Sequence, residues 1–156
     1  MAEPERKIVC SNRRARFDYH IEETFEAGLV LVGSEVKSLR AGRAHLKNAY
    51  ARVEKGELFL MHAHIAPYEP ATRQNHEPER ARKLLLNRRE INRMGGKVRE
   101  RGFTLIPLDI YFRKGRAKLT LALARGKRRF DKREAIAKRE TERRLRRVVR
   151  RRARGR

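Results

Sequence analysis

The chain has 156 residues, which is enough for one modest domain and a tail, and it carries a formal net charge of +23. No stretch approaches the roughly 20 consecutive apolar residues that cross a bilayer, and Cys10 is the single cysteine, which excludes an internal disulfide framework. Residues 125–156 hold 17 Lys or Arg against 4 Asp or Glu. Charge of this density predicts a phosphate-rich partner, because neutralising phosphates releases counterions and dominates affinity for RNA or DNA.

The start of the chain and its cysteine usage indicate a compartment. The first ten residues contain no apolar core of a secretory signal, and one cysteine is typical of a reducing environment, so we expect a cytoplasmic protein. A membrane surface is the main alternative partner for the positive charge. Because the tail lacks the stripe of Trp, Phe and Leu that interfacial helices use, we expect nucleic acid and no membrane.

The first predicted elements are a strand and a helix. Residues 28–32 are a run of Leu and Val after a glycine, which is typical of a buried strand. Residues 34–42 follow with a helical pattern, because two apolar residues stand three positions apart. Ser34 is the expected N-cap of this helix, and Gly42 suits its end. The chain therefore turns from strand to helix near residue 33.

The middle of the chain predicts a hairpin, a loop and a further extended segment. Residues 50–54 and 57–65 flank Lys55-Gly56, a pair that is typical of a tight hairpin turn. Residues 66–82 are polar and contain three prolines, so we expect a long surface loop. Residues 83–86 place three leucines in a row, which fits no single helical face and indicates an extended segment.

A helix is expected directly after these leucines. Asn87 is a favourable N-cap, and a Glu three residues later resembles a capping box. Ile91, Met94 and Val98 then recur at helical spacing, which indicates one buried face. Two consecutive glycines fall inside this pattern and weaken the helix, since glycine is a poor helix former.

A second hairpin is predicted near the end of the body. Residues 103–113 and 116–124 flank Lys114-Gly115, which again suits a tight turn. In the second arm apolar and other residues alternate, so one face should lie in a core. The residues on that face are Ala117, Leu119, Leu121 and Leu123.

Five or six short strands in consecutive hairpins, with one helix inserted between them, predict a mainly β fold. We expect residues 1–124 to form a small closed barrel of the oligonucleotide-binding (OB) type with a few short helices. Closure removes exposed sheet edges, and such barrels present a face to nucleic acid. A β-sandwich is the alternative architecture. Residues 125–156 would form a separate basic tail.

The tail combines disorder with a latent tendency to form a helix. It has few large apolar side chains and cannot bury enough surface to offset its conformational entropy. Three acidic residues each precede a basic residue by four positions, the orientation that favours a helix: Glu134–Lys138, Glu140–Arg144 and Glu142–Arg146. Each pair contributes only about 0.2–0.5 kcal/mol, so we expect the tail to be disordered when free and helical when bound.

Little in the sequence points to an enzyme. Residues 95–97, Gly-Gly-Lys, lack the rest of a phosphate-binding loop. His62 and His64 are two apart on an expected strand, so both would face one way, but no Cys or acidic partner is evident nearby to complete a zinc site. Cys10 has no evident His partner and is expected to be an unreactive thiol. We therefore expect no catalytic residue, metal or cofactor.

The basic residues of the body would be ordinary solvated charges if each pair stood alone. Together with the tail, Arg13-Arg14, Arg88-Arg89 and the Lys and Arg at positions 97 and 99 predict a continuous electropositive surface. Nucleic-acid bases stack on aromatic side chains, although we expect most aromatic residues here to be in the core. The candidates for stacking are Phe17, Tyr19, Tyr50 and Phe103.

Six segments form an ordered set of specific motifs: Asn12-Arg-Arg-Ala-Arg16, Phe25-Glu-Ala-Gly28, Ser34-Glu-Val-Lys-Ser-Leu-Arg-Ala-Gly42, Ala63-His-Ile-Ala-Pro67, Arg82-Lys-Leu-Leu-Leu-Asn87 and Gly126-Lys-Arg-Arg-Phe-Asp-Lys-Arg133. In this set the chain resembles the small protein B family, the SsrA-binding proteins of bacterial trans-translation. The resemblance runs from about residue 12 to residue 140. Six ordered matches to one family are hard to obtain by chance.

This resemblance implies a non-enzymatic RNA-binding protein with an OB-type barrel. It would bind the tRNA-like domain of transfer-messenger RNA (tmRNA) and bring it to ribosomes stalled on messages that lack a stop codon. Residues implied at the RNA are Asn12, Arg13, Phe17, Glu26, Lys83, Leu85 and Asn87. Asn87 thus has two interpretations, helix N-cap and RNA contact. A carboxylate such as that of Glu26 can accept hydrogen bonds from base amino groups.

The resemblance also implies a role for the tail, which would enter the empty mRNA channel of the small ribosomal subunit and fold as a helix near the decoding centre. Residues implied near that centre are Gly126, Lys127, Arg128, Phe130, Asp131, Lys132 and Arg133. Two positions depart from the family pattern. Phe17 replaces a His, so stacking would replace a hydrogen bond, and Phe130 replaces a His or Tyr and lacks a polar tip.

We thus expect a monomer with two partners, tmRNA and the small subunit of a stalled ribosome. The alternative is a general ribosome-associated protein that binds RNA through charge alone. Such a protein would lose affinity for all RNAs equally as salt rises, with no preference for a tRNA-like elbow. An RNA-processing enzyme is disfavoured, since the sequence offers no acidic cluster for a metal.

Overall fold

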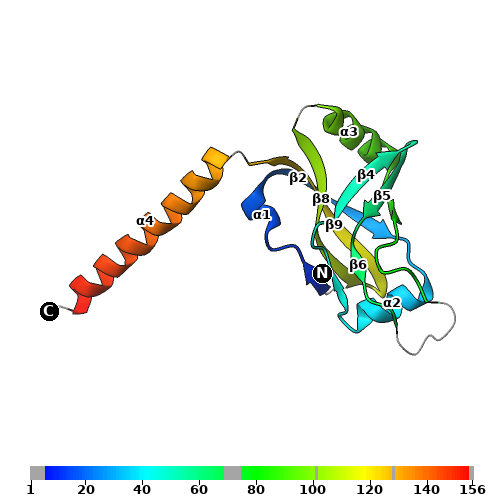
Figure 1. The fold of residues 1–156 in the computed structure, drawn as a ribbon, viewed down its shortest axis with the longest axis horizontal. Coiled ribbons are helices and arrows are strands. Elements are labelled where there is room, and N and C mark those ends of the chain that lie inside the picture. The colour runs from blue at the N-terminus through cyan, green and yellow to red at the C-terminus, as the bar shows by residue number, and fades with distance from the viewer. Residues whose placement is uncertain (1–5, 69–74, 101, 128, 155–156) are drawn as a thin grey trace. The chain divides into compact units, whose positions relative to one another are not determined.

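A computed structural model describes residues 6–68, 75–100, 102–127 and 129–154, without the side chains of 129–135 and 153–154. The chain divides into two compact units, Met1–Gly126 and Lys127–Arg156. The first unit contains all the strands of the described residues together with three helices, and the second contains one helix (Figure 1).

The first unit is built from antiparallel strands, as the sequence predicts. The strands are β1 (Lys7–Ser11), β2 (Tyr19–Leu29), β3 (Ala44–His45), β4 (Tyr50–Glu54), β5 (Glu57–Met61), β6 (His64–Ile65), β7 (Arg82–Leu85), β8 (Phe103–Arg113) and β9 (Arg116–Gly126). The helices of this unit are α1 (Ala15–Asp18), α2 (Gly33–Arg40) and α3 (Arg88–Arg99). The prediction of a mainly β fold with a few short helices is confirmed.

Seven strands form one sheet in the order β1-β8-β4-β5-β7-β2-β9, and β3 and β6 form a separate two-stranded ladder. Strand β8 also pairs with β9 along nearly its full length, from Phe103↔Arg125 to Arg113↔Arg116. The pairings of β8, β4, β5, β7, β2 and β9 therefore form a ring, and β1 extends it at one end of β8. This arrangement gives the sheet one face that is packed and one that is largely exposed.

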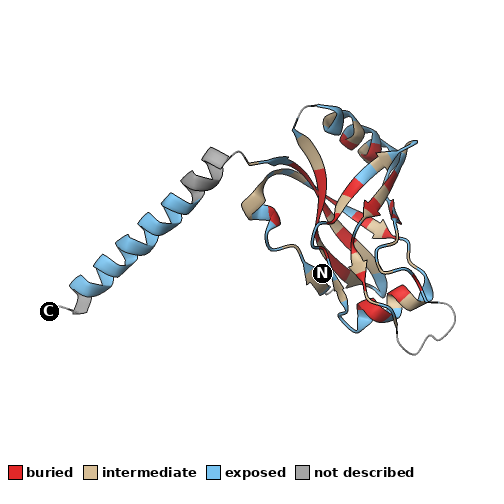
Figure 2. Cartoon of the chain, viewed as in Figure 1, coloured by how far each residue is buried: buried red, intermediate tan, exposed pale blue. Residues whose placement is uncertain are grey.

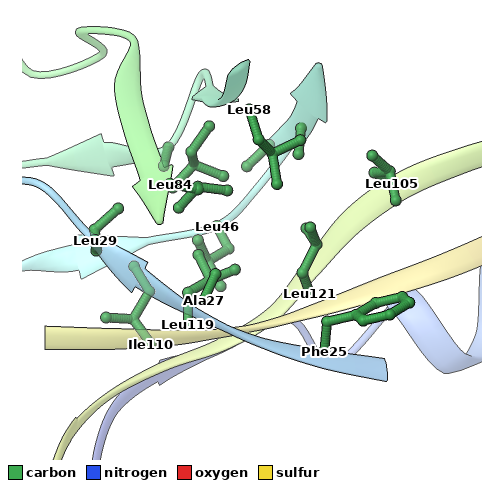
Figure 3. Close-up of a cluster of buried hydrophobic side chains, with 14 of the residues drawn as sticks. Phe25, Ala27, Leu29, Leu46, Leu58, Leu84, Leu105, Ile110, Leu119 and Leu121 are labelled. Carbon is green, nitrogen blue, oxygen red and sulfur yellow. The ribbon is translucent and has the colours of Figure 1, made fainter. Parts of the chain in front are cut away.

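All six strands of this ring contribute to one apolar core (Figures 2 and 3). On β9, Leu119, Leu121 and Leu123 are buried in that core, which confirms the face predicted from their alternation. The opposite face of the same strand is also buried at one end, because α1 covers it. This second, smaller cluster consists of Ala15, Ile106, Leu108, Ala122 and Ala124.

Both predicted hairpin turns are confirmed. Lys55 and Gly56 have φ values of 51° and 76°, and Lys114 and Gly115 have values of 51° and 74°. Two successive left-handed residues are the geometry of a tight turn that matches strand twist. The strand predicted over 57–65 is too long, because His62 has a φ of 60° and separates β5 from β6.

Helix α2 confirms the predicted element but not the predicted cap. Its N-cap is Val32, whose backbone N–H donates to Glu35 Oε1 at 2.9 Å. The hydroxyl of Ser34 is instead 2.8 Å from Nδ1 of His76, with which it forms a hydrogen bond. The buried strand predicted over 28–32 is wrong beyond Leu29, because β2 ends there and both Val30 and Val32 are exposed. Gly42, with a φ of 74°, lies just after the helix as expected.

The segment predicted as a long surface loop, 66–82, is anchored at its end by a buried arginine. Arg82 belongs to β7, and both its side chain and that of Glu35 are fully buried. The Arg82 guanidinium donates to the Glu35 carboxylate and to the carbonyl oxygens of Ala63 (2.6 Å) and Pro78 (2.9 Å). The prediction was wrong for Arg82 because its sequence neighbours give no sign of a buried partner 47 positions away.

The second unit contains α4 (Arg129–Arg154). Every described side chain from Ile136 to Arg152 is exposed (Figure 2). Among the described residues, no helix has both the length and the apolar character needed to span a membrane.

The strand pairing of the first unit reaches Gly126, two residues beyond the expected end of the body at 124, because Tyr19 pairs with Gly126.

Candidate nucleic-acid interface

Glu26, Lys83 and Leu85 lie together on the exposed face of β2 and β7. Gly28 pairs with Leu85 across these strands, and Glu26 and Lys83 each lie two residues from that pair on the same face. Leu84 is 1% exposed and points into the core, whereas Leu85 is 54% exposed. A Cβ on Gly28 would lie only 3.3 Å from the Leu85 Cβ, so the glycine allows the close contact that positions this leucine.

The surroundings of Leu85 combine apolar and basic side chains. A groove with a volume of about 300 Å³ adjoins it, and Phe112, half-buried, forms part of its wall. Its other lining residues include Leu31, Val36, Arg116 and Lys118. A ribose or base could pack on the apolar wall while the cations contact phosphate, which is how nucleic-acid sites usually combine the two.

Glu26 is an exposed carboxylate with partners of its own. Its Oε2 accepts hydrogen bonds from the Tyr111 hydroxyl and from Arg113 Nη1, the latter at 3.2 Å. Arg6 Nη2 lies 3.9 Å from the same oxygen. The hydrogen bond from Tyr111 is the main reason that the pKa of Glu26 is below its usual value, and Arg113 lowers it further. Glu26 is therefore a negative charge in a basic neighbourhood.

Asn87 is the N-cap of α3, but its side chain makes no capping hydrogen bond. The residue is exposed, as are the two arginines that follow it. Of its two interpretations, the position of the cap is confirmed and the capping bond is not. The amide group is thus available for a partner at a helix N-terminus, where donors and positive charge favour phosphate or base acceptors.

Asn12, Arg13 and Phe17 lie elsewhere, on α1 and the segment before it. The Asn12 side chain donates to the carbonyl oxygen of Pro107 at 3.2 Å, and its backbone N–H donates to Leu108. Arg13 is exposed and Phe17 is half-buried. Asn12 and Arg13 line a hollow of about 520 Å³ together with Lys47 and Asn48. The seven body residues implied at the RNA thus belong to two parts of the surface.

The other stacking candidates are also half-buried. Tyr19 packs against the cluster under α1, and Phe103 packs against the main core. Phe103 is additionally flanked by two cations, with Arg125 at 4.7 Å and Lys97 at 5.6 Å from its ring centroid. Tyr50 lies beside the ring of His62 at 5.6 Å between centroids. None of these rings is fully buried in the core.

The two histidines weighed as metal ligands do not share one face of a strand. His64 stacks on His45 with ring centroids 4.7 Å apart, while His62 Nδ1 lies 3.9 Å from Glu79. That acidic neighbour was not evident from the sequence because it lies 17 positions away in the folded loop. Within the described ranges, no group of three or more His, Cys, Asp or Glu side chains is placed to hold a metal ion.

Cys10 is a half-buried thiol on β1. Burial is the main cause that raises its pKa to about 11, and nearby Asp109 raises it further, while a backbone hydrogen bond to Ile110 opposes this. A thiol with such a pKa stays protonated at neutral pH and is a poor nucleophile. This environment agrees with the expectation of an unreactive cysteine.

The tail residues implied near the decoding centre fall at the junction of the two units. Gly126 ends β9 and Lys127 follows it. Arg128 lies outside the described residues. Phe130, Asp131, Lys132 and Arg133 belong to the first turns of α4, of which only the backbone is described.

Sequence reasoning missed Tyr111 and the two arginines that surround Glu26. Tyr111 follows the core residue Ile110 on β8, so alternation along the strand places it on the outward face, where a tyrosine and an arginine two positions apart could have been noticed. Glu26 lies on β2, 85 positions before Tyr111 and 87 before Arg113. Only the strand pairing brings these groups together.

Comparisons with known proteins agree with this picture. A family model described as SmpB protein matches residues 9–151. The SsrA-binding protein of Moorella thermoacetica is 60% identical over 145 residues, which are 92% of this chain and 94% of that protein. The SsrA-binding protein of Desulforudis audaxviator is 58% identical over 150 residues, covering 96% of this chain and 98% of that protein.

A solved structure is similar as well. It is described as "tmRNA-SmpB: a journey to the center of the bacterial ribosome" and matches with a TM-score of 0.66 at 54% sequence identity. The match covers 81% of this chain and 92% of that one. The family model covers most of the chain, and several relatives match over nearly their full length, so the chain belongs to the SmpB protein family.

Proposed function

We propose that this protein binds the tRNA-like domain of tmRNA and delivers it to stalled ribosomes for trans-translation. Its relatives are named SsrA-binding proteins, and the description of the similar solved structure names tmRNA, SmpB and the bacterial ribosome. The observation that carries the proposal is the exposed Leu85 between an anionic Glu26 and a cationic Lys83. An apolar contact flanked by both charges can select one RNA surface, which charge alone cannot do.

In this proposal the two units have different tasks. The body, residues 1–124, is an OB-type closed barrel that contacts the RNA through Asn12, Arg13, Phe17, Glu26, Lys83, Leu85 and Asn87. The ring of six paired strands supports this classification. The tail, residues 125–156, is disordered when free and becomes helical on the ribosome. Its residues 126–133 then lie near the decoding centre, and an occupied mRNA channel would exclude it sterically.

The remaining features of the proposal are those expected of a non-enzymatic RNA-binding protein. The protein acts as a cytoplasmic monomer without cofactor or metal, and it binds RNA without catalysing a reaction. The relatives are named for binding SsrA, and the raised pKa of Cys10 makes its thiol a poor nucleophile. Hydrolysis of RNA by the purified protein with magnesium, lost on replacing one acidic residue, would overturn the non-enzymatic part.

Competition binding at near-physiological salt tests the proposal. Labelled tRNA-like domain of tmRNA is mixed with the full-length protein and challenged with excess bulk tRNA or an unrelated structured RNA. Persistent binding is expected, because contacts with bases and riboses add to the electrostatic attraction that all RNAs share. Displacement by every RNA in proportion to its charge would instead identify a general basic RNA-binding protein, and the rescue function would be withdrawn.

A further inference from the structure

Tyr111 joins a buried ring to an exposed carboxylate. The residue is only 1% exposed, yet its hydroxyl donates to Oε2 of Glu26, whose side chain is 37% exposed. Arg113 donates to the same oxygen at 3.2 Å. Arg6 approaches that oxygen to 3.9 Å, and its guanidinium also lies 4.8 Å from the centroid of the Tyr111 ring.

These contacts restrain a side chain that would otherwise be flexible. A free surface glutamate samples many rotamers, and fixing one of them on binding RNA costs conformational entropy. Here the restraint exists before binding, because the Tyr111 ring is itself immobilised by burial on β8. All three contacts that the described residues make with the carboxylate involve Oε2, so none of them occupies Oε1.

The charge of Glu26 determines which partner that can be. A carboxylate repels phosphate, so it gains affinity only from donors, such as the exocyclic amino groups of bases or a ribose 2′-hydroxyl. Arg113 on β8 and Lys118 on β9 offset this repulsion and also help keep the carboxyl ionised. A fixed acceptor amid cations therefore discriminates between nucleotides, whereas the cations alone would accept any RNA.

We propose that Tyr111 is a positioning residue of the RNA site, which with Arg113 holds Oε2 of Glu26 so that Oε1 accepts a hydrogen bond from an amino or 2′-hydroxyl group of the RNA. The inference rests on the proposed function, since it assumes that Glu26 contacts the tRNA-like domain. The alternative is a purely structural contact, in which Glu26 serves only as the hydrogen-bond partner that the buried Tyr111 hydroxyl requires. The two roles predict different effects on RNA selection.

The first test needs no RNA. In full-length Tyr111→Phe, which keeps the ring and loses only the hydroxyl, the titration of the Glu26 carboxyl carbon is followed by NMR. The pKa of Glu26 is expected to rise, because the lost hydrogen bond is the main cause that lowers it, while Arg6, Arg113 and Lys118 remain. Tyr68→Phe removes a hydroxyl from the loop beside Lys37 and is the matched control. An unchanged titration in Tyr111→Phe would overturn the proposal.

The second test measures affinity for the tRNA-like domain in the presence of excess bulk tRNA. Tyr111→Phe is expected to weaken this binding about tenfold, the usual effect of losing a hydrogen bond to a charged group. Its affinity for bulk tRNA alone should not change. In a double-mutant cycle, Tyr111→Phe should cause no further loss once Glu26 is Ala, since both substitutions act through one carboxylate.

The outcomes separate this inference from the proposed function. If Glu26→Ala weakens selective binding but Tyr111→Phe does not, the positioning role is overturned and the proposed function stands. A loss from Tyr111→Phe that persists in the Glu26→Ala background also overturns it, because the ring position would then act without the carboxylate. If Glu26→Ala itself leaves selective binding intact, the assumed RNA contact of Glu26 is wrong.

Discussion

Leu84 and Leu85 are neighbours in the sequence with opposite environments. Leu84 belongs to the same core as Leu58 and Phe25 (Figure 3). Leu85 lies on the outer face of β7 beside Gly28. Period-two alternation along a strand forces this division once the strand is paired. An exposed leucine costs little stability, but it offers apolar area to an RNA base or ribose.

Replacing Leu84 should affect mainly the stability of the fold, whereas replacing Leu85 should affect mainly RNA binding. Leu84→Ala is expected to lower the free energy of unfolding by about 2–5 kcal/mol, because it leaves a cavity in the core. Leu85→Ala should change it by less than about 1 kcal/mol and yet weaken selective binding to the tRNA-like domain several-fold. Denaturant unfolding and competition binding measure the two effects. Equal destabilisation by both substitutions would contradict the assignment of Leu85 to the RNA surface.

Cys10 gives a prediction about pH. Because the pKa of its thiol is raised to about 11, the reactive thiolate is scarce at pH 8. Alkylation should be roughly 100-fold slower than for an exposed cysteine of ordinary pKa, and its rate should rise about tenfold per pH unit. The rate of iodoacetamide labelling against pH checks this. A plateau near pH 8 to 9 would mean that the thiol is not buried as described.

At the scale of elements, a buried ion pair connects α2 to β7. Glu35 accepts hydrogen bonds from Arg82, from Arg80 at 2.6 Å and from the Val32 N–H. Burial alone would raise the pKa of Glu35, but these hydrogen bonds lower it below the ordinary value. A carboxyl whose folded-state pKa is depressed contributes stability above its unfolded-state pKa, and this contribution is lost as pH falls through the folded-state value.

The ion pair should be sensitive to removal of one partner. Arg82→Met keeps most of the apolar bulk but leaves the Glu35 carboxylate buried with only Arg80 as a charged partner. We expect a loss of about 3–5 kcal/mol in unfolding free energy, measured by urea denaturation at neutral pH. Arg52→Met breaks the exposed pair with Glu54, at 2.7 Å, and is the control that should leave the midpoint unchanged. Similar midpoints for both variants would contradict the buried pair.

At the scale of the whole molecule, the two units differ in what stabilises them. The first unit is held by long-range strand pairing and a shared core. Helix α4 has no such support in the described residues, since its side chains from Ile136 to Arg152 are exposed, including Leu145 at 60% and Val149 at 65%. A helix that depends on local interactions alone is marginal in water.

The helical content of the tail in solution follows from this difference. The circular dichroism of the full-length protein, minus that of a variant ending at Gly126, should give the spectrum of a largely disordered tail. Adding a polyanion such as polyphosphate should convert the difference spectrum to that of a helix, because charge neutralisation removes the repulsion between arginines. A helical difference spectrum without polyanion would show that the tail needs no partner to fold.

The same truncation separates RNA binding from rescue. The variant ending at Gly126 retains all nine strands of the described residues and should unfold cooperatively with unchanged stability. It should bind the tRNA-like domain nearly as well as the full-length protein but should not support tagging of stalled peptides in a reconstituted translation reaction. Equal loss of both activities would contradict the division of tasks between body and tail.

Several elements were predictable because their causes are local. Lys-Gly pairs between alternating segments predicted both hairpins, and the Leu119–Leu123 alternation predicted the buried face of β9. The Ser34 cap and the 57–65 strand were wrong for a tertiary reason. The Ser34 hydroxyl bonds to His76, 42 positions away, and His62 turns the chain where β5 passes into β6.

In the candidate site, too, the sequence predicted some residues, and only the folded chain showed their contacts. Motif resemblance pointed to Glu26, Leu85 and Asn87, but it gave no indication of the partners that fix the Glu26 carboxylate. Tyr111 reaches Glu26 only because β8, β9 and β2 are adjacent strands of one sheet. The separation of Asn12 and Arg13 from the β2–β7 face likewise became visible only in the folded chain.

The sequence by itself determined the charge, the two-part organisation, the β hairpins and the family, because composition and short-range pattern are properties of the chain before it folds. The tertiary structure decided which leucine is exposed, which arginine is buried and which carboxylate is held by a tyrosine. Those choices depend on contacts between residues 47 to 85 positions apart, and only strand register and core packing bring such residues together.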